Sequence, residues 1–401
     1  MKILVVHNRY RIRGGEDSVF ETETAMLRDG GHTVVTWEKA NADIPERQGF
    51  VGKIRLFLST VWSRSSYREM RERLRAERPD VVHVHNFFPQ FSPSIFWACA
   101  AEHVPVVMTL HNYRLTCLNG YLFRASERKI CERCLGRSPI HGVCRRCYRD
   151  SLSASFTVAA MLSVHRLLGT WRRKVTRYIA LTDFAKRKFI EAGLPGNRIV
   201  VKPNVIDIPS DLPELPPLPP DHPPHVIFIG RLSPEKGVDV LLRAWALLQS
   251  DPSAPPAELH IIGDGPERPF LETLAHSTPT HPIVFHGALP RPVALARLRQ
   301  SSLLVFPSLL YEQFPLAPFE AISMGVPIVV ADVVAICDQI RGHKSCRLFR
   351  MGDESVLRDS ILQGLCPSGS VSNPGSALPF ASTAKGNLTE LVSLYVVNAI
   401  R

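Results

Sequence analysis

The sequence contains no apolar run long enough to cross a lipid bilayer. A membrane-spanning helix needs about 20 predominantly apolar residues, and the longest candidate, residues 151–164, is shorter and is soon followed by Arg166. A secretory leader pattern is also absent, because the first two residues lead directly into the strand-like residues 3–7, without an apolar region or a cleavage site. We therefore expect a cytoplasmic protein.

Two common phosphate-binding fingerprints are missing as well. The loop at residues 8–16 contains Gly14 and Gly15, but it lacks the GxGxxG spacing of dinucleotide-binding folds, which disfavours a nicotinamide cofactor. No GxxxxGK[ST] sequence is present either, which excludes a Walker-type phosphate loop.

The composition is that of a globular protein with an anionic partner. The 401 residues are enough for two domains of ordinary size. Because 45% of them are hydrophobic and 21% are charged, a large core can form. The formal net charge of +11 favours nucleic acid, phosphorylated small molecules or an anionic membrane surface as a partner.

A rhythm of strands, loops and helices occurs twice, before and after a proline-rich segment. Short apolar runs bounded by glycine or proline alternate with helix-like segments in both halves, which is typical of doubly wound parallel α/β sheets. Residues 208–224 are rich in proline and predict an extended, semi-rigid linker. We expect a first Rossmann-like domain over residues 1–207, a second over residues 225–365, and a divergent low-complexity tail over residues 366–401.

The nine cysteines are unevenly placed, since five of them fall in an insert at residues 117–147. Two CxxC pairs in this insert match the ligand pattern of a tetrahedral zinc knuckle. The candidate ligands are Cys131, Cys134, Cys144 and Cys147, with Cys117 as an alternative. A reducing cytosol favours metal binding over disulfides; the alternative is a set of free thiols in a long loop. The insert is rich in arginine, but no interleaved aromatics or helical reading module accompany it, so we expect no nucleic-acid binding.

In the second half, polar residues follow two strand-like runs. Arg231 and Lys236 lie in a glycine-bounded loop, where a guanidinium fork and an ammonium both suit phosphate oxygens. Glu312 and Glu320 follow the apolar run at residues 303–306. Because open α/β sheets bind ligands outside the carboxyl ends of their strands, these carboxylates are candidate partners of sugar or ribose hydroxyls. The alternative for Glu320 is a first-turn acid that compensates the helix dipole.

The first half contains a corresponding set of candidates. Gly14 and Gly15 precede a helix, so a ligand can approach its backbone N–H groups closely, although a tight turn alone would also explain them. His111 stands at the carboxyl end of the strand-like residues 104–110 and is expected to face the crevice. His83 lies within a buried strand and is expected to be a core residue.

Taken in order, these motifs resemble glycosyltransferase family 4. The second half carries Gly230-Arg231-x4-Lys236-Gly237, then Gly263-Asp264-Gly265-Pro266, then Glu312-x7-Glu320-Ala321 and Gly325-Val326-Pro327. The first half carries Gly14-Gly15, Asp80 to Asn86, Thr109-Leu110-His111-Asn112 and Pro203-Asn204. The cysteine-bearing insert is similar to one found in a bacterial branch of the family. The resemblance covers roughly residues 1–365, and the order and spacing of the motifs together are highly specific.

The resemblance implies a GT-B fold, in which two Rossmann-like doubly wound domains face each other across a cleft. It also implies a retaining glycosyltransferase that uses a nucleotide-diphosphate sugar. Arg231 and Lys236 would hold the donor diphosphate, Glu320 would bind the ribose hydroxyls, and Glu312 would lie beside the transferred sugar.

The remaining site residues follow from the same resemblance. Gly14 and Gly15 would form the loop near donor and acceptor, Gly263 belongs to the donor-binding set, and His111 would lie at the reacting centre. Retention in this fold is thought to proceed by front-face attack, so no enzyme nucleophile is implied. Such enzymes stabilise the leaving group with Arg and Lys in place of a metal, and no DxD-type motif appears near the expected crevice. We therefore expect no cofactor for catalysis and one candidate structural zinc.

The expected partners are a nucleotide-diphosphate sugar and a glycan or lipid-linked acceptor, in polysaccharide or glycolipid biosynthesis. The basic first half favours an anionic membrane, at the inner face of the cell membrane. The chain departs from the family pattern at residues 333–338, where a glycine-containing loop is usual, and in residues 366–401, where the family's closing helices are not recognisable. The alternative is therefore a catalytically impaired GT-B protein that binds nucleotide or a partner without turnover.

Overall fold

The chain folds into two compact units, each built on its own parallel sheet. The computed structural model describes residues 1–11, 14–44, 49–251, 254–276, 282–333, 335, 337–340, 343–365 and 384–396. The first unit comprises residues 1–122, 131–205 and the C-terminal segment, and the second comprises residues 123–130 and the chain from residue 206 onward to that segment.

The first unit contains a six-stranded sheet in the order β2-β1-β3-β4-β7-β8, with all neighbours parallel. Its strands are β1 (Lys2–Arg9), β2 (Thr33–Ala40), β3 (Val81–Val84), β4 (Val106–Leu110), β7 (Arg177–Ala180) and β8 (Ile199–Val201). Its helices are α1 (Gly15–Asp29), α2 (Phe50–Val61), α3 (Arg64–Glu77), α4 (Ser94–Ala101), α5 (Ile140–Cys144), α6 (Leu152–Leu167), α7 (Thr170–Arg173), α8 (Asp183–Glu191) and α15 (Ala384–Tyr395), with a 3-10 turn at Asn41–Asp43 and another at Gly196–Arg198. Strand β1 is apolar and fully buried from Ile3 to Val6, as expected for a central strand of a parallel sheet covered on both faces.

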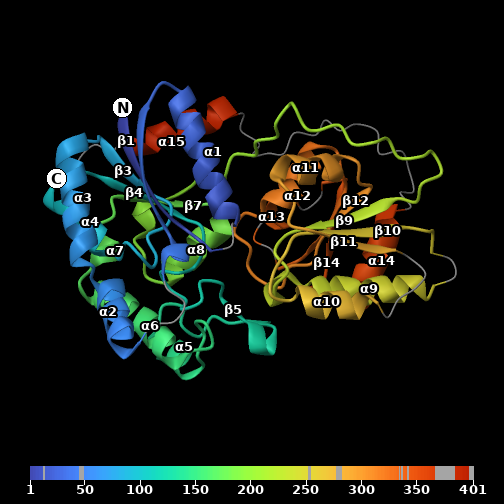
Figure 1. Ribbon diagram of the computed structural model, residues 1–401, viewed down its shortest axis with the longest axis horizontal. Coiled ribbons are helices and arrows are strands. Elements are labelled where there is room, and N and C mark those ends of the chain that lie inside the picture. Colours follow the sequence, from blue (N-terminus) through green and yellow to red (C-terminus); the bar gives the residue numbers. More distant parts are fainter. Residues whose placement is uncertain are drawn as a thin grey trace. The chain divides into compact units, whose positions relative to one another are not determined.

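The second unit contains a six-stranded parallel sheet in the order β11-β10-β9-β12-β13-β14. Its strands are β9 (His225–Ile229), β10 (Glu258–Ile262), β11 (Ile283–Gly287), β12 (Leu303–Phe306), β13 (Ile328–Ala331) and β14 (Cys346–Phe349). Its helices are α9 (Val238–Gln249), α10 (Arg268–Ala275), α11 (Arg291–Arg299), α12 (Leu316–Ser323), α13 (Cys337–Ile340) and α14 (Glu354–Leu365), with a 3-10 turn at Pro234–Lys236. Figure 1 shows α9, α10 and α14 on one face of this sheet and α11, α12 and α13 on the other. The two doubly wound sheets confirm the predicted α/β class.

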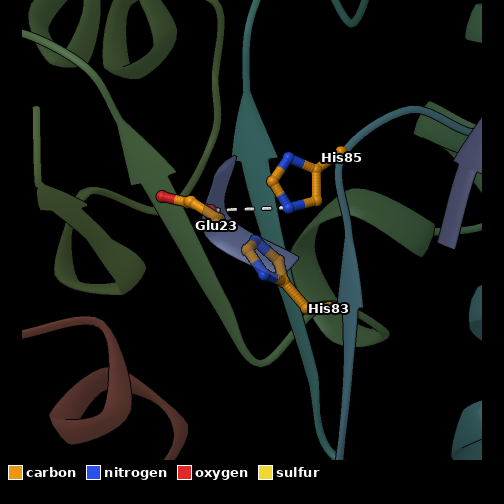
Figure 2. Close-up of side chains that lie close together, drawn as sticks. All are labelled: Glu23, His83 and His85. Atoms are coloured by element: carbon orange, nitrogen blue, oxygen red, sulfur yellow. Dashed lines mark ion pairs between the residues drawn. The ribbon is translucent and has the colours of Figure 1, made fainter. Parts of the chain in front are cut away.

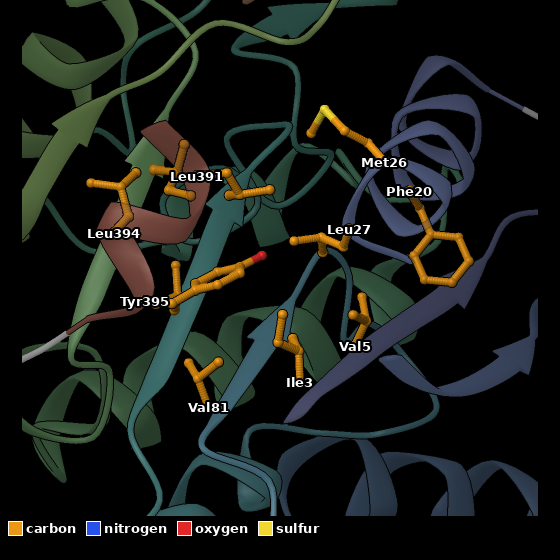
Figure 3. Close-up of a cluster of buried hydrophobic side chains, with 11 residues drawn as sticks. Ile3, Val5, Phe20, Met26, Leu27, Val81, Leu391, Leu394 and Tyr395 are labelled. Carbon is orange, nitrogen blue, oxygen red and sulfur yellow. The ribbon is translucent and has the colours of Figure 1, made fainter. Parts of the chain in front are cut away.

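Helix α15 differs from the divergent tail that we expected. Its apolar residues Leu391, Leu394 and Tyr395 have helical spacing and are at most 7% exposed. They belong to the core cluster of the first unit, together with Ile3 of β1 and Leu27 of α1 (Figure 3). The helix was not recognised because low-complexity sequence precedes it; residues 366–383 of the predicted tail lie outside the described residues.

The cysteine-bearing insert contains a short antiparallel hairpin, β5 (Phe123–Arg124) and β6 (Lys129–Ile130), with a 3-10 turn at Ala125–Glu127. This hairpin belongs to the second unit, where Arg128 forms an ion pair with Asp239 of α9. The predicted first domain was continuous over residues 1–207, so the structure differs from it here. Residues 208–224 contain neither helix nor strand. Among the described residues, no helix combines the length and the apolar character needed to span a membrane.

Candidate active site

The second unit places its candidate donor residues at the carboxyl edge of the sheet. The chain order reverses between the neighbouring strands β9 and β12, and such a switch point is where open α/β sheets bind ligands. Arg231 and Lys236 follow β9, Gly263 follows β10, and Glu312 lies in the loop after β12. Glu320 lies on α12, which ends that loop. The structure therefore gathers the five predicted residues around one edge of one sheet.

Gly263 is demanded by a close approach between two of these loops. Its φ is +140°, and a Cβ atom there would lie 1.8 Å from the carbonyl oxygen of Gly230. A Cβ at Gly265 would lie 2.3 Å from the carbonyl oxygen of Leu232. Only glycine fits such contacts, so these residues let the loops after β9 and β10 pack backbone against backbone.

Lys236 and Glu312 meet where the loops after β9 and β12 converge. The Lys236 ammonium forms an ion pair with the Glu312 carboxylate. Ser308 Oγ donates a hydrogen bond to Glu312 Oε1 at 3.0 Å. A cation suited to phosphate oxygens and a carboxylate suited to hydroxyl donors are thus held side by side.

Glu320 is buried, and its partner was missed by the sequence reasoning. Arg291 Nη2 donates to Glu320 Oε1 at 2.6 Å and to the backbone carbonyl of Asp207 at 2.7 Å. Burial raises the pKa of Glu320, and the Arg291 guanidinium offsets part of this shift. Because α12 begins at Leu316, Glu320 lies beyond the first turn, so the alternative of a first-turn acid that compensates the helix dipole is wrong.

In the first unit, the carboxyl edge of the sheet is organised by Glu16, which the sequence reasoning also missed. Glu16 Oε1 accepts a hydrogen bond from Asn86 Nδ2 at 2.9 Å, and Oε2 accepts one from Asn112 Nδ2 at 3.2 Å. One carboxyl group at the start of α1 therefore joins the loops after β3 and β4. Burial raises the pKa of Glu16 to about 8, and the neighbouring Asp17 carboxylate adds to the shift.

Gly14 and Gly15 border this carboxylate at the start of α1. Among the described residues, a Cβ at Gly15 would meet nothing within 4 Å, and one at Gly14 would meet only Asp17 Oδ2 at 4.0 Å. Gly14 has an ordinary extended φ of −124°. The packing of the described residues therefore does not demand these glycines.

His111 lies half-buried at the end of β4, against His85. His111 Nε2 and His85 Nδ1 are 3.0 Å apart, and the two rings stack at a centroid distance of 5.2 Å. Burial lowers the pKa of His111 to about 3 and holds that of His85 well below its usual value. His111 therefore offers a neutral imidazole at neutral pH.

A buried charged pair lies beside these histidines. Glu23 of α1 accepts a hydrogen bond from Lys202 Nζ at 2.8 Å, and His85 Nε2 is 3.4 Å from the other Glu23 oxygen (Figure 2). Burial acts to raise the pKa of Glu23, but the Lys202 ammonium and the nearby histidines outweigh it and hold this pKa below its usual value. Lys202 thus neutralises the Glu23 carboxylate that lies beside His85.

His83 lies in the same group and is a satisfied core residue, as its place in a buried strand predicted. Its Nε2 is 2.8 Å from Thr109 Oγ1, and its Nδ1 is 2.7 Å from the hydroxyl of Tyr395. Burial lowers the pKa of His83 to about 4, so the ring is neutral and accepts or donates only these two hydrogen bonds.

The cysteines of the insert lie around Cys134. Burial raises the pKa of the Cys134 thiol to about 11, and Cys117, Cys131 and Cys147 each act on it electrostatically. Cys144 is exposed. Among the described residues, the cysteine sulfurs do not form a group of three ligand atoms within 4.8 Å, so the zinc site stays a prediction. Because Cys117 acts on Cys134 and the exposed Cys144 is not among the thiols that do, Cys117 is the better candidate for the fourth ligand.

The two units, each built on a parallel sheet with polar residues at its switch point, define a GT-B architecture. Two family models match the chain: one described as Glycosyltransferase Family 4 matches residues 12–209, and one described as Glycosyl transferases group 1 matches residues 223–366. The chain therefore belongs to glycosyltransferase family 4, which confirms the resemblance.

Related proteins agree with this assignment. The chain is 30% identical over 218 residues to a phosphatidyl-myo-inositol mannosyltransferase of Mycobacterium leprae, a match that covers 54% of this chain and 56% of that protein. It is 24% identical over 370 residues to the Mycolicibacterium smegmatis protein of the same name, covering 88% and 81%. The chain thus spans about half the length of the first relative.

The fold is shared with solved structures at low identity. The Anabaena protein Alr3699/HepE, solved in complex with UDP-glucose, superposes with a TM-score of 0.60 at 16% identity, over 98% of this chain and 97% of that one. At this identity the likeness shows the fold alone, and the activity follows as a proposal.

Proposed function

We propose that this chain is a retaining glycosyltransferase that moves a sugar from a nucleotide-diphosphate sugar to a glycan or lipid-linked acceptor. The observation that carries the proposal is the set formed by Lys236, Glu312, Glu320 and Arg291 at the switch point of the second sheet. Family membership supports the same reading.

In this proposal Arg231 and Lys236 hold the donor diphosphate and stabilise the charge that develops on it as it leaves. Lys236 is paired with Glu312 in the structure. A diphosphate would compete for this ammonium, and Glu312 would then accept a hydrogen bond from the transferred sugar. Glu320, held in place by Arg291, would accept hydrogen bonds from the ribose hydroxyls.

The first unit would supply the groups around the reacting hydroxyl. His111 is neutral, so it would act as a hydrogen-bond partner of the sugar instead of a cation. The open space at Gly14 and Gly15 would admit donor and acceptor. In front-face transfer the acceptor proton passes to the departing phosphate oxygen, so no enzyme nucleophile is needed and no catalytic metal is proposed.

We further propose that the acceptor is reached at an anionic membrane, in polysaccharide or glycolipid biosynthesis. Helix α2 exposes Val51 and Leu58, at 78% and 59%, beside the exposed cations Lys53 and Arg55. Phe156 of α6, 54% exposed, stacks on this helix through Phe57. Exposed apolar and basic side chains on one helix fit an anionic interface. The name of the mannosyltransferase relatives, which includes phosphatidyl-myo-inositol, agrees with such an acceptor.

The proposal is tested by a transfer assay with a panel of UDP- and GDP-sugars and membrane-lipid acceptors, without added divalent metal. We expect transfer by the wild-type chain and loss of most activity, about 100-fold or more, in Glu320→Ala. The anomeric configuration of the product, read by NMR, decides between retention and inversion.

A second candidate is a protein that binds the nucleotide without turnover. One observation favours it: Ala335, which lies where the family usually has a glycine-containing loop, donates its backbone N–H to the carbonyl oxygen of Glu312 at 3.1 Å. The departure from the family pattern therefore contacts the candidate donor loop. Binding of a nucleotide sugar with no transfer to any acceptor would support this candidate.

A further inference from the structure

A second group of metal-ligating side chains lies in the second unit, away from the residues described above. His222, His225 and Glu258 offer ligand atoms that all lie within 4.8 Å of one another. We propose that this group is a binding site for a divalent transition-metal ion, for which Zn²⁺ is the fitting probe. The inference does not depend on the proposed glycosyl transfer.

The spacing of the donor atoms fits a small metal ion. His222 Nε2 is 4.0 Å from Glu258 Oε1, and His225 Nε2 is 3.5 Å from Glu258 Oε2. In tetrahedral zinc sites with bonds of about 2.0–2.1 Å, neighbouring ligand atoms are about 3.3 Å apart. His260 Nε2, which lies 3.2 Å from Glu258 Oε2, is a candidate fourth ligand. Small side-chain shifts would therefore close the set around an ion.

The chain holds two of the ligands in place before any ion binds. His222 and His225 are separated by Pro223 and Pro224, whose rings fix φ and stiffen the backbone between them. His222 Nδ1 lies 3.0 Å from the carbonyl oxygen of Pro223. A hydrogen bond donated there leaves the lone pair on Nε2, which is the atom nearest to Glu258; a carbonyl is a usual second-shell partner of a ligating histidine.

His225 carries an unsatisfied polar atom at the centre of the group. Its Nε2 is buried and has no hydrogen-bond partner among the residues that the structure describes, although a buried polar atom without a partner is costly. His225 and Glu258 are neighbours in register on β9 and β10, so both side chains lie on one face of the sheet. An ion between them would satisfy this nitrogen.

The comparable group in the first unit does not have this property. Glu23, His83 and His85 also lie within 4.8 Å of one another, but Lys202 already neutralises Glu23 and both nitrogens of His83 are hydrogen-bonded. A metal ion there would have to displace an ammonium. Within the described part of the chain, no lysine or arginine forms an ion pair with Glu258. Arg297 acts electrostatically on His225 and is expected to moderate the affinity.

The position of the group indicates a structural role. His225 and Glu258 begin β9 and β10, whereas the candidate donor residues follow the carboxyl ends of these strands. Because the strands run parallel, their first residues and their carboxyl ends lie at opposite ends of the sheet. His222 belongs to the proline-rich segment, so a bound ion would tie the end of that segment to the sheet.

The test is a zinc titration of the full chain after removal of metal by a chelator, with a chromophoric chelator as competitor. The double variant Cys131→Ser/Cys134→Ser removes the candidate cysteine site and serves as the background. We expect this background to bind one zinc ion. His222→Ala or Glu258→Gln should weaken binding about tenfold or more, and His276→Ala, which changes an exposed histidine after α10, should leave it unchanged. Substitution with Co²⁺ should give d–d absorption without a thiolate charge-transfer band.

Equal zinc affinity with and without His222→Ala and Glu258→Gln would overturn the proposal, as would a background protein that binds no zinc. If the double cysteine variant does not fold, elemental analysis of the otherwise wild-type chain decides the question. One zinc equivalent should be lost in His222→Ala and retained in His276→Ala, and equal zinc contents would reject the site. The Lys236→Ala variant should keep its zinc, which separates this outcome from any failure of donor binding.

Discussion

At the scale of single residues, the candidate site depends on a few contacts that reach across the chain. Glu16 joins Asn86 and Asn112, and Arg291 holds Glu320. These contacts link positions 70, 96 and 29 residues apart. Sequence spacing predicted the carboxylates and cations of the second unit, because they follow strands. It could not reveal partners that only the folded sheet brings together.

Gly263 and Gly15 should respond to alanine in opposite ways. Gly263→Ala would place a Cβ atom 1.8 Å from a carbonyl oxygen at a φ of +140°, so we expect a loss of unfolding free energy of about 2–4 kcal/mol or failure to fold. Gly15→Ala meets nothing within 4 Å and should change that free energy by less than about 0.5 kcal/mol. Urea denaturation measures both, and equal losses would contradict the packing described here.

Glu16 should make the first unit less stable as pH rises. Its pKa is raised to about 8 in the folded chain from an ordinary value of 4.5. Between these values the folded state keeps a proton that the unfolded state has lost, so stability falls as pH increases through this window. Glu16→Gln, which mimics the protonated acid, should flatten this slope in denaturation curves from about pH 5 to pH 9. Asp29→Asn, an exposed change on the same helix, is the matched control, and identical slopes for Glu16→Gln and wild type would count against the raised pKa.

At the scale of secondary-structure elements, helices α15 and α2 have properties that the two sheets do not explain. Helix α15 returns from the far end of the chain to pack on β1 and α1 (Figure 3), and Tyr395 reaches His83. It was not predicted because low-complexity sequence precedes it and its partners lie at the start of the chain. The first half was predicted as basic, but the exposed apolar residues of α2 become visible only once the buried face of the helix is known.

Removal of a core side chain from α15 should destabilise the first unit. Leu391 is fully buried, so Leu391→Ala should cost about 2–5 kcal/mol of unfolding free energy. Ser393→Ala, an exposed change on the same helix, should cost less than about 0.5 kcal/mol. Guanidinium denaturation followed by circular dichroism measures both. A Leu391→Ala chain as stable as Ser393→Ala would show that α15 is not part of the core.

Helix α2 should mediate binding to anionic vesicles. Leu58→Glu places a charge on its exposed apolar face and should weaken binding by about tenfold or more, because burial of apolar side chains at the interface is lost. Ile190→Glu, a similar change at an exposed apolar residue of α8, is the control and should bind like wild type. Flotation with phosphatidylserine-containing and neutral vesicles measures this, and the account of α2 fails if both variants bind equally.

At the scale of the whole molecule, two similar sheets carry different chemistry at the same kind of edge. Each sheet reverses its order next to its first strand, and the loops at that point hold Lys236 and Glu312 in one unit and Glu16 and Asn86 in the other. The alternation of strands and helices was sufficient to predict both sheets and the edge of each sheet at which the candidate site residues lie. The units themselves are discontinuous in sequence, because residues 123–130 and α15 find their partners through contacts that no local pattern encodes.

The central claim is that the switch point of the second sheet binds a nucleotide-diphosphate sugar. Isothermal titration of the full chain with UDP- and GDP-sugars tests it most directly. We predict saturable binding of one of these donors, weakened about tenfold or more in both Lys236→Ala and Glu320→Ala, because each removes a charged partner of the ligand. The account would be contradicted if no donor bound, or if both variants bound the donor as strongly as the wild-type chain does.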